Sequence, residues 1–274
     1  GSDNSPQWSP DGKSVAYLRS TSDANYIMYD QPILCVVPAT GGESLLLSKS
    51  LDRPVSNPRW NKDGKNITAV VTDDCERYIS TFDVKNGMMK KVIGGNRSFG
   101  SLEFHPDGSW VTSMSDSQLP SEFYALKDGN LRRLTSIQDD FVAGLSLATV
   151  EKFSSTSKDG VVVSNLLFLP ASAKKEKLPV IFYIHGGPVG QDDFGFDLTR
   201  QMLAAKGYAV IAVNYRGSNG RGIDFCKSIY ADWGNKEVLD IQGAADYLIS
   251  KGIIDGNRMG IGGWSYGGIL TDYT

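Results

Sequence analysis

RMGIGGWSYGGIL, residues 258–270, is the stretch that decides the fold of the carboxy-terminal half of the chain. An apolar segment runs directly into G-x-S-x-G at residues 263–267, and Ile269 and Leu270 begin a helical turn. Strand, glycine-flanked turn and helix in this order are typical of a nucleophile elbow, which holds a serine in a strained conformation at a helix N-terminus. We therefore expect Ser265 to be a nucleophile and the backbone N–H of Tyr266 to face a developing oxyanion.

A phosphate-binding or dinucleotide-binding turn is the alternative interpretation of such a glycine-rich string. It requires G-x-G-x-x-G or G-x-x-x-x-G-K-[ST] directly after a strand. Neither spacing occurs here, because the glycines at positions 260, 262 and 263 lie inside or at the end of the predicted strand. The nucleophile elbow is therefore favoured.

A second glycine motif, His185-Gly186-Gly187-Pro188, follows the apolar strand predicted at residues 180–184. In α/β-hydrolases this is the position of the loop that supplies a second oxyanion donor, and its glycines let the backbone approach the substrate. His185 has three interpretations: a residue that holds the oxyanion loop, a plain structural histidine, or the catalytic base. The last is disfavoured by chain order, since hydrolases of this fold run Ser, then Asp or Glu, then His.

Around these motifs, strands alternate with amphipathic helices, which predicts βαβ units with parallel strands. Helices are expected from Leu198 to Lys206 and from Lys236 to Lys251, each ending at a glycine, with Asn235 as the N-cap of the second. The predicted strands span residues 161–168, 180–184, 209–214 and 258–262. We assign residues 147–274 to the amino-terminal part of an α/β-hydrolase domain, up to the nucleophile elbow.

The first half of the chain repeats one pattern, in which an aromatic residue is followed three positions later by Asp-Gly and then by an alternating apolar strand. The aromatics are Trp8, Trp60 and Phe104, at a spacing close to the ~40–50 residues of a four-stranded propeller blade. Asp-Gly provides a tight turn, and the aromatic is expected to fill the space between blades. We assign residues 1–146 to the carboxy-terminal part of a β-propeller of about three blades. Such a part cannot close a ring, so the chain is expected to begin inside the propeller.

Composition argues against several other classes of protein. The 274 residues are 41% hydrophobic and 22% charged with a net charge of −3, so nothing suggests a nucleic-acid or membrane partner. The three cysteines, Cys35, Cys75 and Cys226, are widely spaced, which predicts single buried or partly buried thiols rather than disulfides or a zinc site. No cofactor or metal is expected. Localisation (cytoplasmic or periplasmic/secreted) and oligomeric state stay open.

The motifs together resemble the prolyl oligopeptidase family, with the acylaminoacyl-peptidase and dipeptidyl-peptidase branches as the nearest match. Besides the propeller-like repeats, four segments in a fixed order carry the resemblance: HGGP (185–188), NYRGSNGRG (214–222), DWGNKEVLD (232–240) and GGWSYGG (262–268). The resemblance implies a serine peptidase that cleaves short peptides. It places Ser265 as nucleophile, the Tyr266 N–H as oxyanion donor and His185 beside the oxyanion hole. Arg216 and Trp233 are expected to hold loops together rather than to touch substrate, and Asp240 is expected to be structural.

In this family the triad Asp and His follow the nucleophile, whereas this chain stops nine residues after Ser265. With two histidines in the sequence and neither suitably placed, the 274-residue chain alone is expected to be inactive. Two alternatives stay open: a propeller-bearing binding protein with a degenerate hydrolase domain, or an esterase. Exopeptidase, acylpeptidase and endopeptidase specificity are not distinguished, and Glu122 is expected to be structural.

Overall fold

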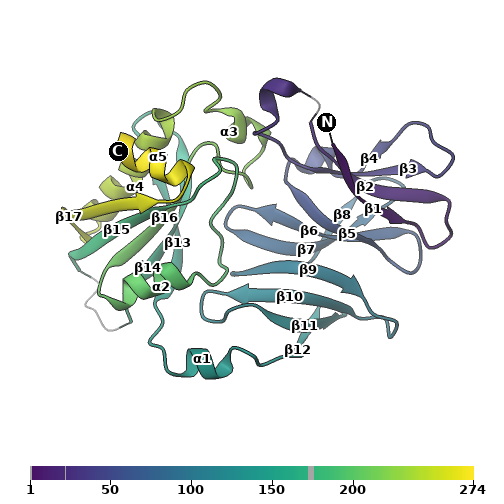
Figure 1. The fold of residues 1–274 in the computed structure, drawn as a ribbon, viewed down its shortest axis with the longest axis horizontal. Helices are drawn as coiled ribbons and strands as arrows, with labels where there is room; N and C mark the ends of the chain where they lie inside the picture. The colour runs from purple at the N-terminus through teal and green to yellow at the C-terminus, as the bar shows by residue number, and fades with distance from the viewer. Residues whose placement is uncertain (1, 22, 172–175) are drawn as a thin grey trace.

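The computed structural model of the chain describes residues 2–21, 23–171 and 176–274. Two parts lie side by side in Figure 1, with strands β1 to β12 in one and the elements from β13 to α5 in the other. No helix among the described residues is long and apolar enough to cross a membrane.

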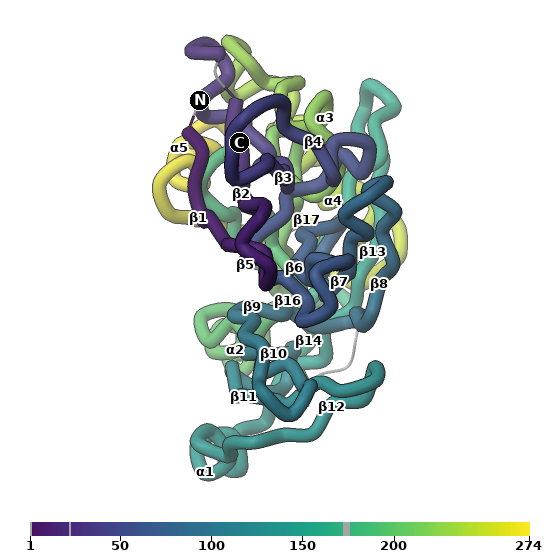
Figure 2. Tube along the Cα trace, turned by 90° about the vertical axis from the view of Figure 1, so that its right-hand side faces the viewer, coloured from purple at the N-terminus to yellow at the C-terminus, as the bar shows by residue number. Residues whose placement is uncertain are grey.

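The first part consists of three antiparallel units of four consecutive strands each. Strands β1 to β4 form a separate sheet, while β5 to β8 and β9 to β12 are joined by one parallel pairing, of Arg77 with Ser98. Figure 2 shows the units following one another down the molecule. The described residues do not close these sheets into a ring. The strands are β1 (Asp3–Trp8), β2 (Ser14–Arg19), β3 (Ile33–Pro38), β4 (Leu45–Leu46), β5 (Val55–Trp60), β6 (Asn66–Asp73), β7 (Glu76–Asp83), β8 (Met89–Ile93), β9 (Arg97–Phe104), β10 (Trp110–Asp116), β11 (Glu122–Lys127) and β12 (Asn130–Arg133); 3-10 turns lie at Ala24–Tyr26 and Lys49–Leu51, and the short helix α1 at Asp139–Ala143.

Each repeated Asp-Gly pair forms the turn between the first two strands of its unit. The glycines Gly12, Gly64 and Gly108 have φ values of 69°, 66° and 89°, a region that favours glycine. The aspartate before each glycine closes the turn, as where Asp11 accepts hydrogen bonds from the Ser9 hydroxyl and the Lys13 N–H. The prediction of three equivalent hairpins is thus confirmed by the backbone.

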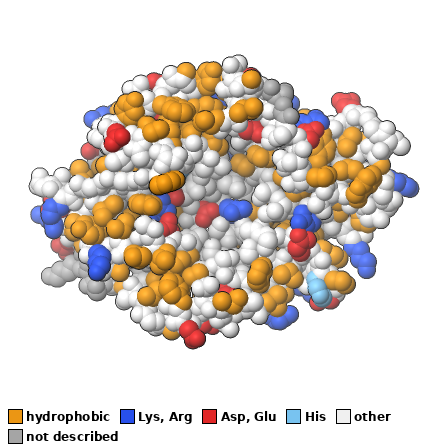
Figure 3. Space-filling view, in the orientation of Figure 1, with side chains coloured by type: hydrophobic (Ala, Val, Ile, Leu, Met, Phe, Trp, Pro, Cys, Tyr) orange, Lys and Arg blue, Asp and Glu red, His pale blue; other side chains and the backbone are white. Residues whose placement is uncertain are grey.

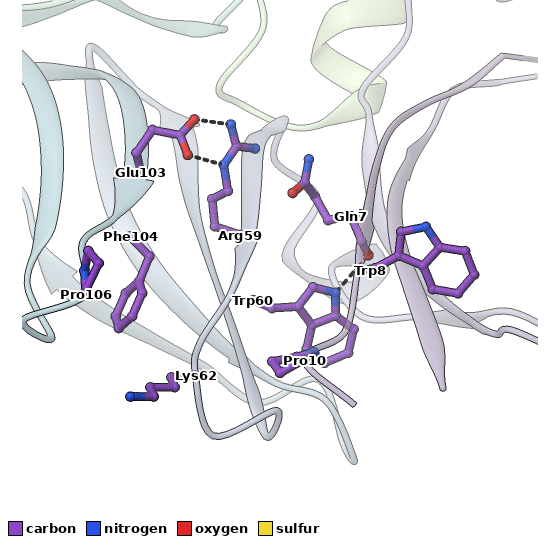
Figure 4. Close-up of a pocket in the computed structure, with 9 residues that line it drawn as sticks. All are labelled: Gln7, Trp8, Pro10, Arg59, Trp60, Lys62, Glu103, Phe104 and Pro106. Carbon is purple, nitrogen blue, oxygen red and sulfur yellow. Dashed lines mark hydrogen bonds and ion pairs between the residues drawn. The ribbon is translucent and has the colours of Figure 1, made fainter. Parts of the chain in front are cut away.

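The repeated aromatics behave less uniformly. Trp60 is buried and its indole N–H donates to the carbonyl of Gln7 in the preceding unit at 2.9 Å, so this residue packs between two consecutive four-stranded units. Trp8, by contrast, is 65% exposed, and its unit has no preceding unit among the described residues against which the ring could pack. All three aromatics line one open cavity of about 460 Å³, where Arg59 also pairs with Glu103 of the next unit (Figure 4).

The second part is a five-stranded sheet in the order β13-β14-β16-β15-β17 with helices on both faces. Its parallel strands are β15, β16 and β17, whereas β13 and β14 pair antiparallel with each other and β14 pairs antiparallel with β16. The expectation of parallel strands throughout is therefore wrong for the first two, which are joined by a hairpin with no helix. The elements are β13 (Thr149–Thr156), β14 (Val162–Leu169), β15 (Leu178–Ile184), α2 (Leu198–Ala205), β16 (Ala209–Asn214), α3 (Ile223–Lys227), α4 (Lys236–Ser250), β17 (Ile254–Gly263) and α5 (Tyr266–Tyr273).

Alternation along the strands divides the core of this sheet into two layers. On β14, Val163 and Leu167 pack in the cluster that includes helices α4 and α5, while Leu166 and Phe168 pack in the cluster that includes Ala204 of α2. Both sheet faces are therefore buried, which explains the near-continuous apolar strands. Helices α2 and α4 end where their glycines predict, at Gly207 and Gly252, both with positive φ.

Backbone and side-chain hydrogen bonds join the two parts. The Asp74 N–H donates to the carbonyl of Gly220 at 3.0 Å, and the Phe194 N–H donates to the carbonyl of Cys75 at 3.0 Å. Lys152 on β13 pairs with the Asp74 carboxylate at 2.6 Å. Figure 3 shows a hollow between the two parts on this face, with acidic and basic side chains interspersed rather than gathered by sign.

Candidate functional site

Strand β17 and helix α5 meet in a turn of two residues, Trp264 and Ser265. Ser265 has φ 57° and ψ −120°, a conformation that costs a non-glycine residue about 1–3 kcal/mol and persists only where its surroundings enforce it. It is the N-cap of α5, since its carbonyl accepts hydrogen bonds from the N–H groups of Gly268 at 2.9 Å and Ile269 at 3.1 Å. The predicted strand, strained serine and helix are all present in the structure.

The two glycines that flank this turn leave no room for a side chain. A Cβ on Gly263 would lie 2.8 Å from the carbonyl carbon of Gly267, and a Cβ on Gly267 would lie 2.9 Å from the carbonyl carbon of Ile184. These contacts are with backbone, which cannot move aside as the end of a side chain can. Glycine is required at both positions because the backbones of β17, α5 and the end of β15 pack closely together around the serine.

Parallel pairing of β15 with β17 brings the His-Gly-Gly-Pro loop to the serine. Ile184 is opposite Gly263 in the register, so the residues that follow each strand emerge at the same sheet edge. A Cβ on Gly186 would lie 2.8 Å from the Trp264 carbonyl oxygen and 3.2 Å from the Ser265 Cβ. Gly187 has φ 136°, and the peptide bond between Gly187 and Pro188 is cis.

Unused backbone donors surround the serine. Among the described residues, the N–H groups of Gly186, Gly187 and Tyr266 have no hydrogen-bond acceptor. Ser265 is exposed, and its hydroxyl makes no capping hydrogen bond to the start of α5. Free N–H groups on two adjacent loops beside an exposed hydroxyl form an arrangement that can bind an oxyanion.

The ring of His185 is fully engaged inside the protein. Its Nδ1 lies 2.8 Å from the Gly186 carbonyl and its Nε2 lies 3.0 Å from the hydroxyl of the buried Ser218. A neutral ring with the proton on Nδ1 satisfies both contacts, donating to Gly186 and accepting from Ser218. Burial lowers the pKa of His185, and the Asp192 carboxylate opposes this only in part. These bonds fit a residue that holds its loop in shape.

Tyr215, which directly follows β16, connects this loop to the elbow. Its ring stacks on His185 with centroids 4.5 Å apart and planes at 16°, and its hydroxyl donates to the His185 carbonyl at 2.9 Å. On its other side it lies 6.0 Å from the ring of Tyr266, tilted by 33°. One aromatic side chain thus contacts both loops that border Ser265.

The Tyr266 side chain points into the core, away from the exposed serine. Its hydroxyl donates a hydrogen bond to the Glu237 carboxyl on α4. The rings of Tyr266 and Trp233 form a T-shaped pair with centroids 5.0 Å apart and planes at 82°, and the Trp233 indole N–H donates to the Tyr29 hydroxyl of the first part at 2.7 Å. Tyr215, Ser218 and Glu237 were given no role from the sequence, although all three lie inside the quoted NYRGSNGRG and DWGNKEVLD segments.

Arg216 and Asp240 form a buried ion pair that fixes the loop after β16. The guanidinium bonds Asp240 at 2.9 Å, the Asp159 carboxylate and the Lys236 carbonyl, while the Arg216 N–H also donates to Asp240. Ser157 adds a further hydrogen bond to Asp240. This network agrees with the loop-holding role expected of Arg216 and with the structural role expected of Asp240.

Glu122, which was expected to be structural, lies on β11 in the other part of the molecule. Its buried carboxylate accepts hydrogen bonds from the Thr135 hydroxyl and the Gln138 N–H, and it pairs with Arg133 at 3.1 Å. Through these hydrogen bonds, Glu122 ties the segment that follows β12 to β11. The structure therefore gives Glu122 a structural role.

Comparisons with known proteins agree with this geometry. Residues 194–274 match the profile of the prolyl oligopeptidase family. An uncharacterized peptidase of Bacillus subtilis, YuxL, is 32% identical over 79% of this chain, and dipeptidyl-peptidase 5 of Porphyromonas gingivalis is 26% identical over 98%. The chain spans 33% and 40% of the length of these two relatives. The fold is shared with Pyrococcus horikoshii acylaminoacyl peptidase, with a TM-score of 0.83 and 24% identity over 96% of this chain and 41% of that one.

Proposed function

We propose that this chain, which belongs to the prolyl oligopeptidase family, carries the nucleophile and oxyanion-binding part of a serine peptidase that hydrolyses short peptides. One observation carries the proposal. Ser265 is exposed in a strained turn, while free N–H groups from its own helix and from the Gly186–Gly187 loop lie beside it. The dipeptidyl and acylaminoacyl peptidases among its relatives support peptides as the substrate class.

The chemistry assigned to this site is acyl transfer. The Ser265 oxygen attacks the carbonyl carbon of the scissile peptide bond and gives its proton to a base, while the carbonyl oxygen becomes an oxyanion. The N–H of Tyr266 and an N–H of the Gly186–Gly187 loop stabilise that oxyanion, and one such donor typically contributes about 3–4 kcal/mol. Collapse breaks the C–N bond, the amine leaves with the proton, and water then hydrolyses the acyl-serine by the same steps.

The general base is not supplied by either histidine of this sequence. His185 uses both ring nitrogens within its loop, and His105 lies in the turn between β9 and β10, where it contacts Asp107. The relatives are much longer than this chain. We assign the His and Asp of a Ser-Asp-His triad to parts of the natural polypeptide outside these 274 residues.

The domain organisation is part of the same proposal. We assign residues 1–146 to a β-propeller, because three consecutive four-stranded antiparallel units with equivalent Asp-Gly hairpins have the form of propeller blades. Residues 147–274 are assigned to an α/β-hydrolase domain, because a mixed sheet covered on both faces ends in the strand, serine turn and helix of an elbow. Helix α1 and the residues after it make the connection.

A fluorophosphonate probe tests the proposed function on the native gene product that contains this sequence. Covalent labelling that is lost in Ser265→Ala, together with release of product from short peptide substrates, is the expected result. Free and acetylated amino termini in the substrate set separate dipeptidyl-peptidase from acylpeptidase activity. A native gene product that neither labels nor cleaves these peptides would contradict the proposal and favour a degenerate hydrolase domain. Cleavage of simple esters but of no peptide would favour an esterase.

A further inference from the structure

Glu237 is a buried carboxyl group that the acyl-transfer chemistry does not use. It lies in the first turn of α4 with no exposed surface. The Tyr266 hydroxyl donates to its Oε1, and its Oε2 has no partner among the described residues. Burying a carboxyl group away from water is costly unless it gains compensating contacts, so its presence here needs an explanation.

The surroundings of Glu237 favour its uncharged form. The titratable groups that face it are Tyr29, Tyr215 and Tyr266 from three other segments and Asp240 from its own helix, and none of them is a cation. Burial raises the pKa of Glu237, although the Tyr266 hydroxyl and nearby backbone N–H groups of the α4 N-terminus act in the opposite direction. A neutral carboxyl group still accepts a hydrogen bond through its carbonyl oxygen.

The partner of Glu237 is the residue that directly follows the nucleophile. Tyr266 supplies the oxyanion N–H, and its side chain is held by Trp233 on one side and Tyr215 on another. A hydrogen bond at the hydroxyl adds a directional contact at the far end of the side chain, which ring packing does not provide. Anchoring at both ends constrains the start of α5 and hence the strained φ of Ser265.

We propose that Glu237 is a positioning residue for the nucleophile turn and that it acts through the Tyr266 hydroxyl as an uncharged hydrogen-bond acceptor. The inference rests on the proposed function, because it assigns the oxyanion role to the Tyr266 N–H. It involves no contact of Glu237 with substrate. Displacement of a catalytic group by as little as about 1 Å can lower a rate about 100-fold, so loss of this anchor is expected to slow acylation.

Four variants of the native gene product test this role by the second-order rate of fluorophosphonate labelling and by kcat and KM for a cleaved peptide. Glu237→Leu and Tyr266→Phe each remove the hydrogen bond and are expected to lower the labelling rate and kcat about 10- to 100-fold with little change in KM. Their double variant is expected to be no worse than the poorer single one. Glu237→Gln keeps an uncharged acceptor and is expected to stay within about threefold of wild type.

Ser157→Ala is the matched control, because it removes a buried hydrogen bond from Asp240 on the same helix without touching Tyr266. It is expected to lower the melting temperature while the labelling rate stays unchanged. Should Glu237→Leu fail to fold, Tyr266→Phe and Glu237→Gln carry the test, since both nearly conserve shape.

The outcomes separate the two proposals. Labelling that depends on Ser265 but is unaffected by Tyr266→Phe and Glu237→Leu would overturn the positioning role and leave the proposed function intact. If Glu237→Gln lowered the labelling rate and kcat as much as Glu237→Leu does, the assignment of an uncharged carboxyl group to Glu237 would be wrong. Absence of any labelling in the folded wild-type gene product would overturn the proposed function, and this inference with it.

Discussion

Gly186 and Ser265 approach so closely that a Cβ on the glycine would lie 3.2 Å from the Cβ of the serine. The same Cβ would lie 2.8 Å from the backbone oxygen of Trp264, below the separation that real side chains show. Two loops from neighbouring parallel strands are thus in backbone contact at Ser265. The N–H groups that we propose as oxyanion donors owe their position to this contact.

Gly186→Ala is therefore expected to displace the oxyanion loop from the serine. The added methyl group would collide with backbone atoms, so one of the two loops must move by several tenths of an ångström to remove the clash. This is expected to lower the free energy of unfolding by about 1–3 kcal/mol. Labelling of the native gene product by a fluorophosphonate is expected to slow about 10- to 100-fold. Gly190→Ala is the control, because its Cβ would lie 3.4 Å from its nearest neighbour. Equal labelling rates in both variants would contradict this prediction.

Adjacent glycines on α5 give a second comparison. A Cβ on Gly267 would collide with the Ile184 backbone, whereas a Cβ on Gly268 would lie 3.6 Å from its nearest neighbour, the Gly263 oxygen. Gly267→Ala is expected to lower the unfolding free energy by about 1–3 kcal/mol through overpacking. Gly268→Ala is expected to be neutral or to gain up to ~1 kcal/mol from helix propensity. Urea unfolding measures both, and a stable Gly267→Ala protein would show that the turn can relax.

The elbow was predictable from sequence because its signals are local. The strand, both flanking glycines and the helix that starts at Tyr266 lie within one short segment, and the strain at Ser265 follows from the turn itself. Hairpin glycines such as Gly64 were predictable for the same reason. The antiparallel pairing of β13 with β14 was not, because periodicity indicates a strand without giving the direction of its neighbour.

The support of the elbow was not predictable, because it depends on contacts between distant segments. Tyr215, Ser218 and Glu237 reach the two loops across separations of about 30 residues. Nothing in their immediate sequence distinguishes a core tyrosine or a helix glutamate from one that contacts the turn at Ser265. The complete burial of Glu237 with a tyrosine as its partner is the observation that supports the proposed role.

The buried Arg216–Asp240 pair gives a stability prediction. Asp240→Ala leaves a buried guanidinium without its main partner and is expected to cost about 3–5 kcal/mol. Asp159→Ala removes a partner whose side chain is 38% exposed and is expected to cost about 0–1 kcal/mol. Denaturant unfolding of the two variants makes the comparison. If both variants lost a similar free energy of unfolding, Asp159 and Asp240 would contribute equally to the stabilisation of Arg216.

The 274-residue chain itself is expected to show no peptide hydrolysis and negligible fluorophosphonate labelling. Its Ser265 hydroxyl has no described acceptor for its proton, and His185 is engaged by Gly186 and Ser218. Triad enzymes without their base retain only a residual rate from the oxyanion hole. Gel-based labelling of the purified chain beside the native gene product tests this. Strong labelling of the chain that disappears in His185→Gln would identify His185 as the base after all.

Two buried thiols predict a loss of stability at alkaline pH. Burial raises the pKa of Cys75 and that of Cys226 to about 12 each, above an ordinary value of 9.0. Between these two pKa values the thiols stay protonated in the folded state but ionise in the unfolded state. Their contribution to the free energy of unfolding is therefore complete below about pH 9 and is lost as the pH rises toward 12. Urea midpoints measured at pH 8 and pH 10 should therefore fall more for wild type than for Cys75→Ala/Cys226→Ala. All other groups titrate equally in wild type and in the double variant. If the urea midpoint fell by the same amount in both proteins between pH 8 and pH 10, the thiols of the folded protein would ionise as readily as free thiols.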